Sequence, residues 1–124
     1  MNESELIKLS IDKARQDRYL QLLLKPKKRK ELLDKLNHNP PLCSKNTKWL
    51  SSFNDVLAIL NINPRIEVRL ISSAPELDGK LMTFNKAVEE VPYYDWGTII
   101  GISSTLAIYY GEAGERAAII TKNV

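Results

Sequence analysis

Hydrophobic residues follow a helical spacing in the first half of the chain. They recur every three or four positions between residues 6 and 24, at Ile7, Ile11, Ala14 and Leu22, with Arg18 in the same register. This spacing predicts a helix over 6–24, with Ser10 as a possible N-cap. The alternation of Ile7, Leu9 and Ile11 leaves a short strand as an alternative for its start.

Prolines divide the rest of this half. Pro26 suits the first position of a helix, so a second helix is predicted over 26–37, ending before Pro40 and Pro41. Residues 38–52 are predicted as a loop anchored by Leu42, Trp49 and Leu50. A third helix is predicted over 53–61, capped by Ser52 or Asn54 and closed by Pro64.

The spacing then changes to the period of a strand. Ile66, Val68 and Leu70 alternate with charged residues, which predicts a strand over 66–71. Thr83 is placed to cap a short helix over 84–91 that Pro92 and the segment 93–95 would stop. Three closing strands are predicted at 98–102, 105–110 and 116–121, with a possible bulge at Gly101.

These elements predict an α+β fold in a single domain spanning 1–124. Closing strands joined by short turns must be antiparallel neighbours, and the helices are expected to lie on one face of the sheet. Ile99 and Ile100 must nevertheless point to opposite faces, as must Tyr109 and Tyr110. Either helices of this chain cover both faces of the sheet, or one face is an interface for a partner.

Composition excludes several classes. The chain has 124 residues and an ordinary apolar content of 44%, with no apolar run near the ~20 residues that span a bilayer. The acidic start does not resemble a secretory signal, and Cys43 is the only cysteine, so a soluble, cytoplasmic protein without membrane contact is expected. His38 and Cys43 are each single, so no metal site, catalytic residue or cofactor is predicted.

Positive charge is concentrated in the first half of the chain. Residues 1–50 hold 12 lysines and arginines against 6 acidic residues, and the densest run contains Lys27, Lys28, Arg29 and Lys30. Cations at a helix start can bind phosphate, which suggests an anion or nucleic-acid site. The competing interpretation is a solvated face neutralised by Glu31 and Asp34.

Aromatic residues supply the leading functional hypothesis. They gather near the closing strands, at Tyr93, Tyr94, Trp96, Tyr109 and Tyr110. Tyrosine and tryptophan are favoured in interfaces, so we expect a small non-enzymatic protein that binds another protein, or a copy of itself, through an aromatic sheet surface. The alternatives are that these residues only seal the sheet, that the basic run binds nucleic acid, or that the chain is an enzyme of unrecognised class.

Overall fold

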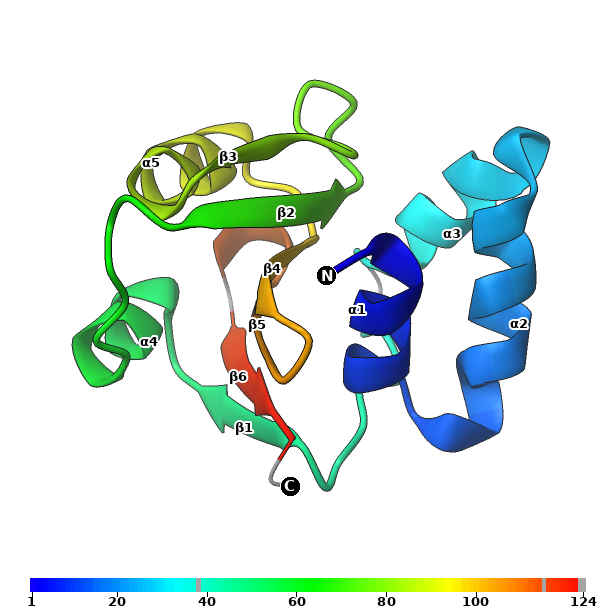
Figure 1. Ribbon diagram of the computed structural model, residues 1–124, viewed down its shortest axis with the longest axis horizontal. Helices are drawn as coiled ribbons and strands as arrows, with labels where there is room; N and C mark the ends of the chain where they lie inside the picture. The colour runs from blue at the N-terminus through cyan, green and yellow to red at the C-terminus, as the bar shows by residue number, and fades with distance from the viewer. Residues whose placement is uncertain (38, 115, 123–124) are drawn as a thin grey trace.

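The computed structural model, which describes residues 1–37, 39–114 and 116–122, contains one antiparallel sheet in the strand order β1-β6-β5-β4-β2-β3 (Figure 1). The strands are β1 (Thr47–Leu50), β2 (Glu67–Ser72), β3 (Leu81–Thr83), β4 (Thr98–Ser103), β5 (Leu106–Tyr110) and β6 (Ala117–Thr121). The predicted α+β class is confirmed. The expectation that the helices lie on one face is wrong, because a separate hydrophobic core covers each face.

The first face is covered by the N-terminal helices α1 (Glu3–Ser10), α2 (Lys13–Leu24) and α3 (Arg29–Lys35), the last preceded by the 3₁₀ turn η1 (Pro26–Lys28). Helix α1 packs on β5 and β6, and α2 packs on α1 and α3 (Figure 1). Gly101 makes the close approach of α1 possible, because a Cβ there would lie 2.5 Å from a methyl carbon of Leu6. A shift in strand pairing between Gly101 and Ser103 confirms the expected irregularity.

The single helix predicted over 6–24 is wrong. The chain breaks at Ile11, which is extended and forms an isolated antiparallel bridge with Leu42. Ser10 therefore ends α1 instead of capping a helix, and Asn2 caps α1 in a reciprocal pair with Glu5. Buried residues occur on both sides of the break. The hydrophobic spacing therefore continues across it, and the sequence pattern does not reveal that the helix ends.

The second face is covered by α4 (Phe53–Ile59) and α5 (Phe84–Tyr94). The predicted caps are confirmed, since the hydroxyls of Ser52 and Thr83 accept backbone N–H groups at 3.2 and 3.3 Å. The prediction that the helix ends at residue 91 is wrong, because Pro92 lies inside α5, which runs to Tyr94 and is capped by Asp95, in the 93–95 segment that was also expected to stop it. Beyond the proline the Asp95 N–H still donates to the Val91 carbonyl at 3.0 Å, and Tyr94 packs against the same core as Val91.

Two short strands were not predicted. Strand β1 lies inside the expected loop 38–52 and pairs with β6, from Thr47 opposite Ile120 to Leu50 opposite Ala117. Strand β3 pairs with β2 at the other edge. The predicted strands at 66–71, 98–102, 105–110 and 116–121 are confirmed within one or two residues.

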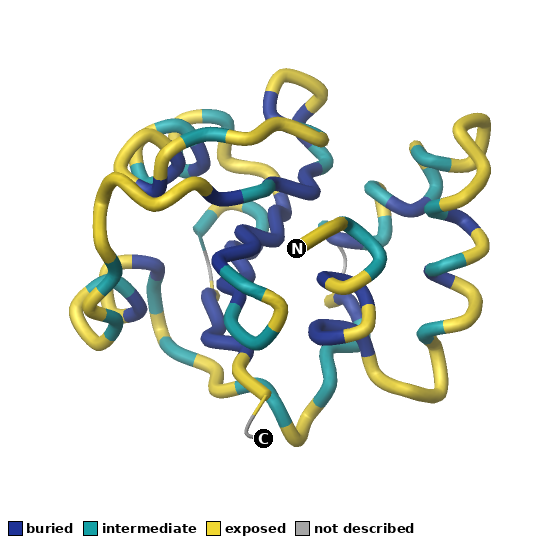
Figure 2. Tube along the Cα trace, in the orientation of Figure 1, coloured by how far each residue is buried: buried dark blue, intermediate teal, exposed yellow. Residues whose placement is uncertain are grey.

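The central strands are buried on both sides (Figure 2). Ile99 and Tyr109 face the N-terminal helices, whereas Ile100 and Tyr110 face α4 and α5. Of the two arrangements left open by the sequence, the one with helices on both faces is the one observed.

Candidate functional site

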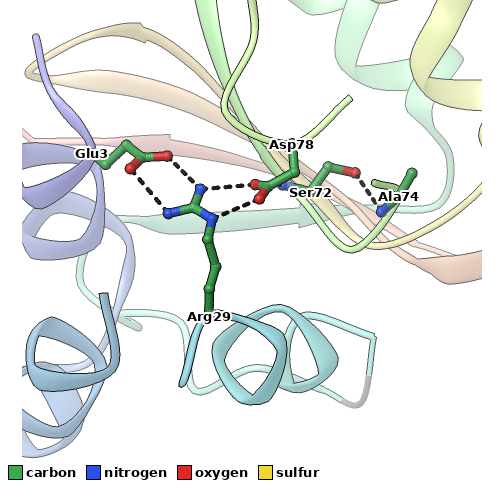
Figure 3. A network of polar contacts seen from close by, with 5 residues as sticks. All are labelled: Glu3, Arg29, Ser72, Ala74 and Asp78. Carbon is green, nitrogen blue, oxygen red and sulfur yellow. Dashed lines mark hydrogen bonds and ion pairs between the residues drawn. The ribbon is translucent and has the colours of Figure 1, made fainter. Parts of the chain in front are cut away.

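The basic run lies on η1 and the first turn of α3, and it does not act as one group. Lys27, Lys28 and Lys30 are exposed. Arg29 instead points inward, where its Nε and Nη2 donate to the carboxylate of Asp78 at 2.6 and 2.9 Å and its Nη1 donates to Glu3 at 3.1 Å (Figure 3).

This network joins three segments that are distant in sequence. Asp78 also accepts the backbone N–H of Ser72 at 3.1 Å, while the Ser72 hydroxyl accepts the N–H of Ala74 (Figure 3). Hydrogen bonds to Asp78 and then to Glu3 raise the pKa of Arg29 above its ordinary value. Arg29 is therefore committed to holding α1 and α3 against the 72–78 segment, and only the lysines of the run face solvent.

The aromatic residues do not form one surface. Tyr109 and Tyr110 are both buried, so neither side chain contributes to an exposed aromatic surface of the sheet. The Tyr109 hydroxyl donates to the carbonyl of Leu36, and the Tyr110 hydroxyl donates to Asp95. Burial raises the pKa of Tyr109 to about 12, with Glu112 as a secondary cause.

Tyr93 and Trp96 are exposed to solvent, with exposed fractions of 79% and 46%, and Tyr94 is half-buried. The rings of Tyr93 and Tyr94 meet edge to face with centroids 5.1 Å apart. These residues end α5 and lead into β4. Tyr93, Tyr94 and Trp96 therefore lie outside the central sheet, in which Tyr109 and Tyr110 are buried.

Strand β1 presents a free hydrogen-bonding edge among the described residues. The Thr121 N–H donates to the Asn46 carbonyl, so in the alternating antiparallel pattern Lys48 and Leu50 also face β6. The main-chain groups of Thr47 and Trp49 must then point away from the sheet. An edge of this kind can accept a further strand from another chain.

Trp49 stands at this edge with Arg116, whose guanidinium carbon lies 3.9 Å from the centre of the indole ring. Trp49 also meets Tyr109 edge to face, with ring centroids 5.9 Å apart. The stacked pair fixes the indole at the edge while leaving it 37% exposed.

Trp49 and Arg116 border two depressions. The first, here called the apolar depression, has a volume of about 770 Å³, and its other lining residues are the apolar Leu50, Ala58 and Ile59 together with the polar Ser51 and Asp55. The second, here called the polar hollow, has a volume of about 340 Å³ and is also lined by Asn37, Asn39, Tyr109 and Glu112. The β1 edge thus has two recesses beside it, of which the apolar depression has the larger share of hydrophobic lining residues.

Sequence reasoning missed this site except for Tyr109. Trp49 was assigned to a loop, and Arg116 was expected only as the start of a strand. The signal available in the sequence was Trp49 itself, since an aromatic residue outside a hydrophobic pattern is a candidate for binding.

In the ranges 1–37, 39–114 and 116–122, no group of three or more histidine, cysteine, aspartate or glutamate residues could hold a metal ion. His38 lies outside the described residues. Among the helices that the structure describes, none is long and apolar enough to cross a membrane. In comparisons with protein-family models, curated proteins and solved structures, no family, relative or structure matches this chain.

Proposed function

We propose that this protein is a non-enzymatic binding protein that pairs the free edge of β1 with an extended segment of another protein. The observation that carries the proposal is the outward direction of the Thr47 and Trp49 main-chain groups, beside an indole that is 37% exposed. Main-chain hydrogen bonds would supply affinity, and the apolar depression would receive a hydrophobic side chain of the partner.

The depression supports this assignment because it is next to the edge. Ile59 is 52% exposed there, and Ala58 beside it is also exposed. If two copies paired through β1 about its centre, Lys48 of one copy would lie opposite Lys48 of the other. The repulsion between these like charges opposes such a dimer. We therefore favour a different protein as partner over a second copy. The proposal places the protein in the cytoplasm, in keeping with its single cysteine.

A matched pair of substitutions tests the main-chain contact. Thr47→Pro removes one outward N–H, whereas Thr47→Val keeps it, and both lose the side-chain hydrogen bond to Cys43. The tagged protein and both variants are purified from cells under native conditions, and bound proteins are quantified by mass spectrometry.

We expect a partner that is retained by wild type and by Thr47→Val but reduced about tenfold by Thr47→Pro. Circular dichroism establishes that both variants are folded. Equal recovery with both variants, or recovery of the free protein alone, would overturn the proposal. A dimer of wild type that Thr47→Pro dissociates would replace the foreign partner with a second copy.

A second candidate is binding of nucleic acid by the exposed lysines. The α2–η1–α3 segment, residues 13–35, holds nine lysines and arginines against three acidic residues. Because Arg29 is hydrogen-bonded to Asp78 and Glu3, the phosphate contacts would be made by Lys27, Lys28 and Lys30. Replacing these lysines with glutamine should abolish a salt-sensitive retention on DNA or RNA, and unchanged retention would exclude the segment.

A further inference from the structure

Among the described residues that line the polar hollow, two carry opposite charges and do not form an ion pair with each other. Glu112 and Arg116 both line it, yet the ion pairs of the described part of the chain involve neither residue. Arg116 is held over Trp49, and Glu112 is half-buried at the 3₁₀ turn η2 (Glu112–Gly114). A simple anion in the hollow would face Glu112, and a simple cation would face Arg116.

The hollow also offers an oriented hydrogen-bond donor. The Asn37 Oδ1 accepts the Gly97 N–H at 2.7 Å and the Ser73 hydroxyl at 2.9 Å, which fixes the direction of the amide. Its Nδ2 group has no hydrogen-bond partner among the described residues and is available to a ligand. Trp49 and Tyr109 provide aromatic surface beside it.

Residues with positive φ, a strained backbone conformation, occur in and near the lining of the polar hollow. Asn39, Asp95 and Ala113 are the non-glycine residues with positive φ in the described part of the chain, at 48°, 61° and 60°. Asn39 and Ala113 line the hollow, and the Ala113 N–H donates to the Asp95 carbonyl at 3.2 Å. Such strain is characteristic of binding sites, where surrounding contacts maintain it.

We propose that the polar hollow binds a small zwitterion of the α-amino acid class. The ligand carboxylate pairs with Arg116 and accepts from Asn37 Nδ2, its ammonium group pairs with Glu112, and its side chain contacts Trp49 and Tyr109. The volume of about 340 Å³ suits a ligand of this size. This binding is separate from pairing at the β1 edge, and neither requires the other.

The test is an amide-resolved NMR titration of the full chain with individual L-amino acids of apolar, acidic and basic side chain. L-leucine is compared with isopentylamine, which lacks the carboxylate, and with isocaproate, which lacks the ammonium group. Glu112→Gln and Arg116→Gln each remove one charge from the hollow. Lys122→Gln, an exposed residue outside the hollow, is the control.

We expect saturable shifts at Asn37, Asn39 and the Trp49 indole with at least one amino acid. Each of the two hollow variants should weaken binding by about tenfold or more, while Lys122→Gln leaves it unchanged. Three results would overturn the proposal: no shift with any amino acid at about 10 mM, equal binding of isocaproate or isopentylamine, or unaltered binding by both hollow variants. All of these leave the Thr47 experiment unaffected.

Discussion

The hydroxyl of Tyr109 donates a hydrogen bond to the backbone carbonyl of Leu36, so the centre of the sheet is tied to the residue that ends α3. Both residues are buried. The carbonyls at a helix end lack partners within the helix, and this tyrosine satisfies one of them across 73 residues of sequence.

Tyr109→Phe should therefore lower the free energy of unfolding by about 1–2 kcal/mol, because a buried carbonyl loses its partner while the ring remains. Urea denaturation measures the difference. The control is Tyr93→Phe, in a residue that is 79% exposed, which should leave stability within about 0.5 kcal/mol of wild type. Equal losses from both substitutions would contradict this role.

Alkaline pH should destabilise the fold through the same residue. Burial raises the pKa of Tyr109 from 10.0 to about 12, so the folded state holds this proton more tightly than the unfolded chain. Its contribution is complete below pH 10 and is lost as the pH rises toward 12. Urea denaturation across this range should show a steeper loss for wild type than for Tyr109→Phe, and parallel curves would refute the assignment.

Two glycines should differ in their tolerance of alanine. At Gly97 an added Cβ would lie 2.4 Å from the backbone oxygen of Leu36, whereas at Gly101 it would meet the movable methyl groups of Leu6 at 2.5 Å. Gly97→Ala should cost about 3 kcal/mol or prevent folding, and Gly101→Ala should cost less. The thermal midpoints of the two variants give the order, and the reverse order would show that α1 is the more rigid neighbour.

Arg29 should act on stability and not on anion binding. Arg29→Met breaks contacts with Glu3 and Asp78, whose side chains are 23% and 13% exposed, and should cost about 1–3 kcal/mol. Lys28→Gln, in the adjacent exposed residue, should cost less than about 0.5 kcal/mol. Denaturation curves provide both values. A loss of nucleic-acid retention in Arg29→Met without a loss of stability would reverse the assignment.

The sequence predicted elements best where a local pattern and the final packing agree. The alternation in 66–71 and the β-branched runs of the closing strands specified their faces, and the helix caps at Ser52 and Thr83 were visible as single residues. The break at Ile11 was hidden because the hydrophobic spacing continues through it. It is fixed by distant contacts, namely the bridge to Leu42 and the backbone hydrogen bonds that join Asp12 to Pro41 and Ser10 to Cys43.

The candidate site could not be predicted from local sequence patterns either, because it also depends on contacts between segments that are distant in sequence. Strand β1 has four residues, and among the strands that the structure describes it pairs with β6 alone. The contact of Trp49 with Arg116 and the hollow beside it exist only once that pairing has formed. For Tyr109 and Tyr110, alternation predicted opposite faces, but it could not show that helices cover both.

Pairing of Thr47 with Ile120 also has a consequence for the order of folding. During synthesis β1 leaves the ribosome long before β6, and until then it has no strand to pair with. Closing such a long loop is entropically costly and slows folding. We expect the hairpin of β4 and β5 to form first and β1 to join last, so the nascent chain exposes Trp49 and both edges of β1 for much of its synthesis.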